Sequence, residues 1–286
     1  MSAIAIEALC VVVLVGSTPF LVADDSREAE SHRRMEYMQD LISQFEVTVS
    51  DAPDEVVTFT TTPLLRYSNP VQNSYSDGCV WLWTQDSVPL AATSLSIRGN
   101  RKVGIEFTSL SVKPLSVNRQ GAATWSPASS GLMHVELDGA PEVHGAAPVR
   151  LAQMRKLASE FTVQKVSDPA NPTVLRLLTQ PIHRYSCPTN GIVDGALFSF
   201  SEATDPEALL VLEACEPTPP VPANRTWRYS LVRMSSQPLV MFLRDKEVFH
   251  VEKYWGNPRT RHDPYIEEIL ETYTDNDPRL QDPPIK

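Results

Sequence analysis

The sequence predicts an α+β protein made of two tandem homologous units, each an N-terminal helix packed on an antiparallel sheet of about six or seven strands. The chain aligns with itself at an offset of about 117 residues. Each aligned half begins with apolar residues at helical spacing, and then continues with short runs rich in β-formers between Asp-Pro and Pro-containing turns. Helix first and sheet afterwards, repeated once, is the α+β pattern.

The composition is that of a folded, acidic protein. Of its 286 residues, 42% are hydrophobic and 21% are charged, which is ordinary for a globular chain that buries a core. The formal net charge of -10 repels phosphate backbones, so we expect no nucleic-acid partner.

The segment 1–23 resembles a secretory signal peptide. An apolar run, Ala8–Gly16, precedes Ser17–Ala23, where cleavage after Ala23 is expected. The n-region is atypical because it carries Glu7 and no Lys or Arg. Pro19 interrupts the run well short of the roughly 20 apolar residues of a membrane span. We therefore expect a secreted or periplasmic protein without a transmembrane span; an uncleaved N-terminal anchor and a buried first strand are the alternatives.

The internal alignment covers helix, strands and turns in one register. Its matched segments are Met38–Phe45 with Met154–Phe161, Pro63–Pro70 with Pro181–Pro188, and Asp77-Gly78 with Asp194-Gly195. A repeat of this extent predicts the same strand order in both units.

The first element of each unit is predicted to be an amphipathic helix. The apolar positions are Met35, Met38, Leu41, Ile42 and Phe45 in one and Leu151, Met154, Leu157, Ala158 and Phe161 in the other. Asp25 or Ser26 is the expected N-cap of the first helix, and Pro148 fits the first turn of the second.

The strands that follow carry aromatic residues on one face. Cys79, Trp81 and Trp83 alternate along one strand, and Ala196, Phe198 and Phe200 alternate along its partner in the second unit. We expect both sets to pack beneath the helices. Stacking of exposed Trp81 and Trp83 on sugar rings is the alternative.

Composition shifts divide the chain into five segments. They are 1–23, the signal peptide; 24–125, the first unit; 126–147, a linker with one possible strand at Leu132–Leu137; 148–256, the second unit; and 257–286, a C-terminal tail with a short helix expected at Pro264–Tyr273.

Two sets of shared polar residues are the candidate sites. They are Arg66, Tyr67 and Asp77 in the first unit and Arg184, Tyr185 and Asp194 in the second. In an antiparallel pair each Arg reaches the Asp across the following loop, so the pairs either tie the fold together or bind an anion.

No catalytic, cofactor or metal motif occurs in the sequence. His183, near Ser186, Cys187 and Asp194, is the one cluster with the ingredients of a hydrolase, but the first unit has no counterpart for its His or Cys. A surface histidine is the alternative.

Three cysteines remain after the signal: Cys79, Cys187 and Cys215. Cys187 and Cys215 fall on the same edge of the predicted sheet, and export would permit a disulfide between them. Ends two strands apart lie about 10 Å from each other, whereas a disulfide needs less than about 7 Å between Cα atoms. Free thiols are therefore the alternative.

The segments Arg150–Phe161, Gln180–Tyr185, Asp194–Phe198 and Thr204–Glu207 resemble an uncharacterised family of exported bacterial proteins with a duplicated helix-plus-sheet unit. The first unit departs from this pattern, with Ser87-Val88-Pro89 in place of Thr204-Asp205-Pro206. The resemblance implies the architecture and an exported setting, but no established function and no site residues.

These observations favour an exported binding or structural interaction module with an unknown protein or small-molecule partner. A carrier of an apolar small molecule between helix and sheet is the alternative, and a hydrolase using His183 is the third hypothesis.

Overall fold

The computed structural model describes residues 20–68, 75–98, 102–217, 224–256 and 260–272. Antiparallel strands dominate it, with two α-helices, so the protein belongs to the α+β class. Most of the expected signal segment lies outside the described residues. No helix in the described part of the chain is long and apolar enough to cross a membrane.

The described residues of the first half, 20–125, form one helix and eight strands. In chain order they are α1 (Phe20–Ile42), β1 (Phe45–Val49), β2 (Thr58–Phe59), β3 (Leu65–Tyr67), β4 (Tyr75–Gln85), β5 (Val88–Arg98), β6 (Lys102–Ser109), β7 (Leu115–Arg119) and β8 (Ala122–Trp125). Because α1 begins at Phe20, the expected caps Asp25 and Ser26 lie inside the helix, and that prediction is wrong.

The second half, residues 147–251, has a similar order of elements. They are α2 (Ala147–Ala158), β10 (Phe161–Lys165), β11 (Thr173–Val174), β12 (Arg176–Leu177), β13 (His183–Cys187), η1 (Pro188–Asn190), β14 (Ile192–Glu202), β15 (Asp205–Cys215), β16 (Thr226–Arg233), β17 (Leu239–Leu243) and β18 (Lys246–Val251). Pro148 lies in the first turn of α2, as predicted.

Each half divides its strands between two sheets instead of forming the single sheet that was expected. Large sheet 1 has the order β19-β6-β5-β4-β2, with β3 also paired to β4; large sheet 2 has the order β9-β16-β15-β14-β12, with β13 also paired to β14. The smaller sheets are β1-β7-β8 and β11-β10-β17-β18. The split follows from burial, because helix and small sheet together cover one face of each large sheet.

The outer edge of each large sheet comes from outside the half that it completes. Strand β9 (Val135–Glu136) lies in the predicted linker and pairs with β16. Strand β19 (Tyr265–Thr272) lies in the C-terminal tail, follows η2 (Tyr254–Gly256), and pairs with β6 of the first half. The helix predicted at Pro264–Tyr273 is therefore wrong: this segment is a strand of large sheet 1, Tyr265 and Ile266 are buried in the core cluster of the first half, and long-range pairing overrides the local pattern.

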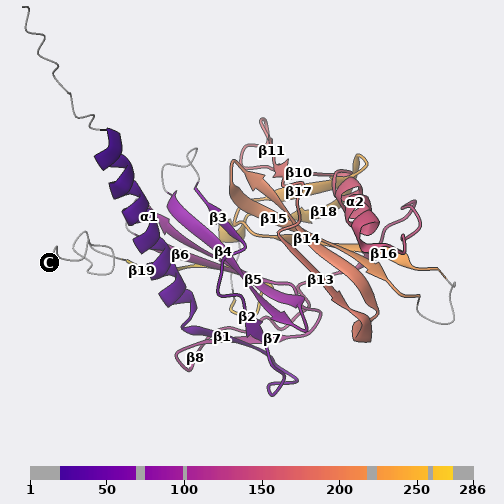
Figure 1. Ribbon diagram of the computed structural model, residues 1–286, viewed down its shortest axis with the longest axis horizontal. Coiled ribbons are helices and arrows are strands. Elements are labelled where there is room, and N and C mark those ends of the chain that lie inside the picture. The colour runs from indigo at the N-terminus through magenta and orange to yellow at the C-terminus, as the bar shows by residue number, and fades with distance from the viewer. Residues whose placement is uncertain (1–19, 69–74, 99–101, 218–223, 257–259, 273–286) are drawn as a thin grey trace, which may run out of the picture.

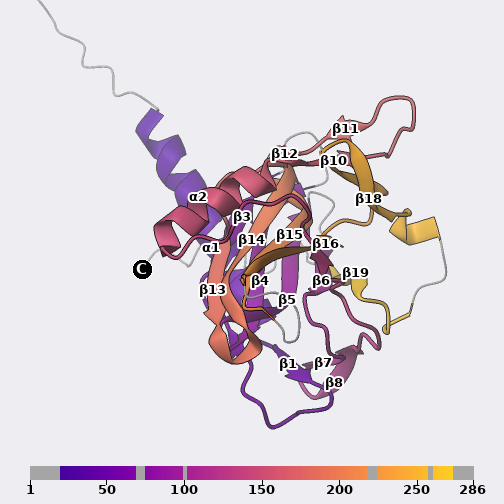
Figure 2. The same cartoon turned by 90° about the vertical axis from the view of Figure 1, so that its right-hand side faces the viewer.

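The two large sheets lie face to face at the centre of the molecule, with α1 and α2 on opposite outer sides (Figure 1). When the molecule is turned, β14 and β15 lie in front of β4 and β5 (Figure 2). One core cluster joins both sheets, through Val80 and Leu82 of β4 and Leu209 and Val211 of β15 among others. Strands β4, β5, β14 and β15 are consequently buried on both faces.

The opposite face of each large sheet packs beneath its helix. Cys79, Trp81 and Trp83 share a core cluster with Met38 and Leu41 of α1. In the second half Ala196, Phe198 and Phe200 share a cluster with Met154 and Leu157 of α2. The predicted facing of both sets is confirmed, and the buried tryptophans are not available to stack on sugars.

Strand β19 offers a direct test of the fold. Replacing Ile266, which is 5% exposed, with Ala should lower the free energy of unfolding by about 2–4 kcal/mol, because three buried side-chain carbon atoms are removed and a cavity is left. Urea denaturation followed by tryptophan fluorescence measures the change. The control is Ile269→Ala on the same strand, where the side chain is 43% exposed and we expect about 0.5 kcal/mol or less. Equal effects would show that β19 does not complete large sheet 1.

Candidate functional site

The predicted Arg–Asp pairs tie each large sheet to its helix. Arg184 donates from Nε to Asp194 Oδ1 over 2.9 Å and from Nη2 to Oδ2 over 2.6 Å. The same Nη2 donates to the carbonyl of Ala147, at the start of α2, over 2.8 Å. Asp194 is buried, and Arg150 of α2 donates to its Oδ2 over 2.8 Å as well. One carboxylate therefore joins the β13–β14 hairpin to the helix.

The first half has a similar tie, in which Arg66 holds Asp77. Arg66 Nε lies 2.9 Å from Asp77 Oδ1, and its Nη2 bonds to Oδ2. That Nη2 also donates to the carbonyl of Ser31 in α1 over 2.7 Å. These contacts support the structural interpretation, because the guanidinium groups already hold a carboxylate; anion binding stays a hypothesis.

The tyrosines next to these arginines lie across glycines. Tyr67 pairs with Gly78, and Tyr185 pairs with Gly195. A Cβ atom at either glycine would lie 2.4 Å from the Cζ of the tyrosine ring. In the Asp-Gly sequence that the two halves share, each residue therefore has its own role. The Asp binds the Arg, and the Gly leaves room for the Tyr ring.

The residues around His183 are engaged in contacts other than those of a nucleophile, base and acid. His183 Nε2 lies 2.9 Å from the carbonyl of Ser87 in the first half, and its ring stacks on Tyr185 at 5.7 Å. Asp194, the acid that would orient the histidine, is held by two arginines. Cys187 is buried with Sγ 3.2 Å from Thr189 Oγ1.

The thiols of Cys79, Cys187 and Cys215 are free in the structure. Cys187 and Cys215 both pair with Ile192, from opposite sides, and so lie two strands apart. That separation is about 10 Å, and a disulfide would require the backbone to move.

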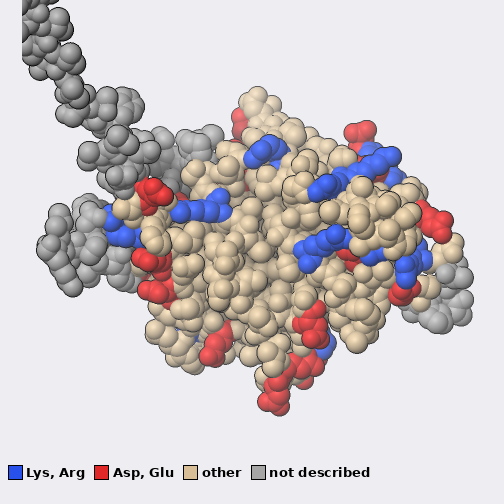
Figure 3. Space-filling model, viewed as in Figure 1, with Lys and Arg blue, Asp and Glu red and all other residues tan. Residues whose placement is uncertain are grey.

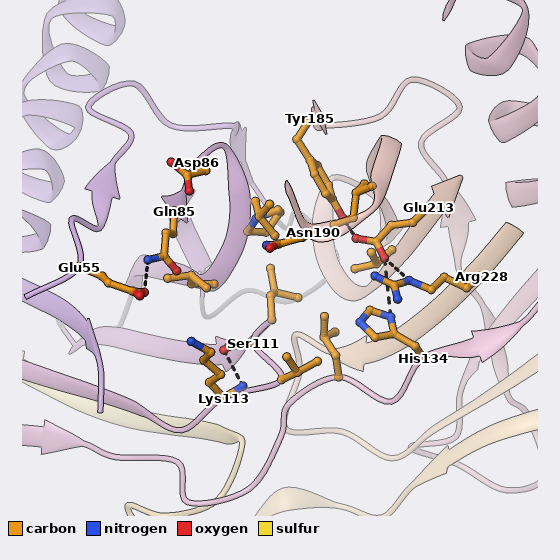
Figure 4. A pocket seen from close by; sticks show the side chains of 18 residues that line it. Glu55, Gln85, Asp86, Ser111, Lys113, His134, Tyr185, Asn190, Glu213 and Arg228 are labelled. Atoms are coloured by element: carbon orange, nitrogen blue, oxygen red, sulfur yellow. Dashed lines mark hydrogen bonds and ion pairs between the residues drawn. The ribbon is translucent and has the colours of Figure 1, made fainter. Parts of the chain in front are cut away.

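A cleft of about 460 Å³ opens between the two large sheets. Figure 4 shows side chains of the first half on one side of it and side chains of the second half on the other. Its apolar lining residues are Val88, Pro89, Leu90, Leu110, Val112, Leu132, Ile192 and Val211. The remaining lining residues are polar or charged. The volume falls within the range of small-molecule sites, about 300–1,000 Å³.

A buried carboxylate lies at the polar end of the cleft. Glu213, in β15, is 2% exposed. Its Oε1 accepts a hydrogen bond from Tyr185 Oη over 2.7 Å, and its Oε2 accepts one from Arg228 Nε over 2.6 Å. His134, from the linker beside β9, places Nδ1 2.9 Å from Ser230 Oγ and 3.8 Å from Glu213 Oε2. We call Tyr185, Glu213, Arg228 and His134 the polar cluster (Figure 4).

The environment of the polar cluster sets its protonation. Burial raises the pKa of Tyr185 well above its ordinary value, and the neighbouring Glu213 adds to the rise, so the phenol stays protonated and donates. Burial also lowers the pKa of His134, and the charge of Arg228 lowers it further, against an opposing contribution of Glu213. Neutral His134 is therefore favoured near pH 7.

Among the described residues, the corresponding region of the first half holds a different set of contacts. Ser96 lies opposite Gly78 as Glu213 lies opposite Gly195. There Arg98 donates to Glu267 of β19 over 2.8 Å, and Trp255 donates to the same carboxylate over 2.9 Å. A hollow of only about 30 Å³ remains nearby, beside Glu106 and Glu207.

Sequence reasoning found Tyr185 but not the rest of the polar cluster. Glu213 carries a visible signal, because it is a single acidic residue within the apolar run Ala208–Ala214. Arg228 sits opposite it in β16, and His134 arrives from a segment with no periodic pattern. Only the pairing of β9 with β16 brings this histidine to the cleft.

Within the described ranges, no group of three or more His, Cys, Asp or Glu side chains could hold a metal ion. Comparisons with protein-family models, curated proteins and solved structures find no match. The geometry of the cleft is therefore the basis for any functional proposal.

The close contact between the glycines and the tyrosine rings can be tested by substitution. Gly195→Ala should lower the free energy of unfolding by about 1–3 kcal/mol, because the new methyl group overlaps the Tyr185 ring. Chemical denaturation measures the loss. The control is Gly145→Ala, where a Cβ atom meets nothing within 4 Å and φ is not positive. Similar stability of the two variants would contradict the close Tyr–Gly contact.

Proposed function

We propose that this protein binds a small amphipathic molecule in the cleft between its two large sheets. The observation that carries the proposal is a cleft of about 460 Å³ in which apolar side chains from both halves lie beside the polar cluster around the buried Glu213. Apolar lining with a few convergent polar groups is the usual composition of ligand sites.

This location differs from the space between helix and sheet that the sequence suggested. Beneath both helices the cores are filled by close-packed side chains, among them Trp81 and Trp83 in the first half and Phe198 and Phe200 in the second. The cleft instead borders the core shared by the two sheets, so a carrier role is better supported there.

A comparison of the halves supports the proposal. If the halves are copies of one ancestral unit, the first-half counterpart of the polar cluster is the region of Arg98, Glu106 and Glu267. In that region Arg98 pairs with Glu267, and a hollow of about 30 Å³ lies beside Glu106 and Glu207, whereas the second half borders the cleft of about 460 Å³. One of two related sites would then have kept a binding role while the other became structural.

A hydrolase using His183 has less support. Its ring bonds to a carbonyl and stacks on Tyr185, and Asp194 is committed to Arg150 and Arg184. A binding function is therefore better supported than a hydrolase function.

Filling the cleft should abolish binding. We expect Leu132→Trp to weaken binding of the neutral apolar dye Nile red at least tenfold, because the half-buried Leu132 lines the cleft and an indole would occupy it. Fluorescence titration gives the dissociation constants. The control is Met133→Trp at the adjacent residue, whose side chain is 70% exposed and does not line the cleft. Equal affinities in the wild type and both variants would refute the proposed site.

We also propose that the protein is exported, on the strength of the apolar run Ala8–Gly16 and the acidic residues after Ala23. Expression in a bacterium with an intact secretion system should release a chain that begins at Asp24. N-terminal analysis of the periplasmic or secreted fraction measures this. Recovery of the full chain with Met1 from the cytoplasm alone would contradict export.

A further inference from the structure

We propose that the ligand of the cleft carries a carboxylate head group, which Arg228 and His134 bind while its apolar chain lies along the walls of the cleft. This inference rests on the proposed function and adds the chemical class of the ligand. It follows from the donors that the polar cluster leaves available.

Arg228 offers donors to the cleft, and His134 offers another when its Nε2 carries a proton. Arg228 uses Nε for Glu213, and its two terminal nitrogens have no protein partner among the described residues. His134 engages its neighbours through Nδ1, which leaves Nε2 available in the same part of the structure. Figure 4 shows both side chains beside the cleft. Two adjacent donors at a cavity wall match the two oxygens of a carboxylate.

Glu213 does not itself serve a cationic ligand. Both of its oxygens already accept hydrogen bonds, from Tyr185 and from Arg228, and its side chain is 3% exposed. A ligand ammonium would have to displace Arg228 and would leave that guanidinium beside a second positive charge. The buried acid therefore orients Arg228 and does not contact the ligand.

The apolar walls accommodate the rest of such a molecule. Leu90 and Leu110 come from the first half, and Leu132, Ile192 and Val211 come from the linker and the second half. An alkyl chain of about ten carbons can bury apolar surface between such walls, and the removal of that surface from water favours binding.

A carboxylate in this position should bind together with a proton. His134 faces Glu213 of β15, Arg228 and Ser230 of β16, and Tyr185 of β13. Glu136 of β9 lies opposite Arg228, and Lys113, Glu55 and Asp86 lie on the first-half side of the cleft. The Glu213–Arg228 pair is neutral overall, so the ligand adds an unbalanced negative charge. Protonation of His134 compensates for this charge. The imidazole, which burial keeps neutral in the free protein, therefore becomes positively charged in the complex.

The sign of the pH effect follows from this linkage. The pKa of His134 is lowered from 6.5 in the free protein, and a bound carboxylate raises it, so the complex holds more protons than the free protein. Affinity for a carboxylate should therefore rise as the pH falls from about 8 to about 6, where the carboxylate itself stays ionised.

The experiment compares three probes that share one chain: decanoate, 1-decanol and decylamine, each below its aggregation concentration, titrated calorimetrically into the full chain. We expect decanoate to bind about tenfold or more tightly than 1-decanol, as charge-assisted hydrogen bonds would produce. Titration in buffers of different ionisation enthalpy should show proton uptake with decanoate and none with 1-decanol.

Three variants test which residues produce the preference for decanoate and its pH dependence. Arg228→Gln should remove most of the preference for decanoate, and His134→Gln should remove its pH dependence while the cleft still binds Nile red. Arg225→Gln is the matched control, since Arg225 pairs with exposed Glu216 and does not line the cleft. It should change neither property.

The outcomes separate the two proposals. Equal binding of decanoate and 1-decanol, both lost in Leu132→Trp, would overturn the carboxylate head group and leave the cleft as the site. Tighter binding of decylamine would overturn the head group in favour of a cation. Failure of all three probes and of Nile red would overturn the proposed function together with this inference.

Discussion

The face-to-face packing of the two large sheets is the constraint on which the rest of the structure depends. It requires β4, β5, β14 and β15 to be apolar on both faces, because one face meets the opposite sheet and the other meets a helix and a small sheet. Strands buried on both sides carry few polar groups. Two that do occur there, Glu213 and Ser94, find hydrogen-bond partners inside the protein.

The same packing explains why a cleft forms between the sheets. Two twisted sheets that pack face to face touch along their centre and separate toward their ends. At one end the gap is occupied by the Arg98–Glu267 pair, with Trp255 bonded to the same carboxylate. At the other end a cleft of about 460 Å³ remains, and the side chains around it are both apolar and charged. Charge is otherwise spread mostly around the periphery of the face in Figure 3, where the centre is largely uncharged.

The chain path couples the two halves more closely than a flexible linker between independent domains would. Strand β9 precedes the second half and completes its sheet, while β19 follows the second half and completes the sheet of the first. His183 of the second half bonds to Ser87 of the first, and Thr108 donates to the carbonyl of Arg233 over 2.7 Å. Each half therefore depends on contacts from beyond its own boundaries, and the cleft exists only when both are in place.

The sequence alone determined the local chemistry of this protein. The spacing of Met38 and Leu41 predicts a helical face, alternation at Trp81 and Trp83 predicts a strand face, and Arg184 with Asp194 predicts a tie across a hairpin, because each pattern acts over a few residues or one turn. The tertiary structure decided the rest. Tyr265–Thr272 forms a strand because β6 offers an unpaired edge, and His134 meets Glu213 because β9 pairs with β16. Such contacts join residues far apart in the chain, and their energy comes from burial and hydrogen bonding that exist only after the two sheets have met.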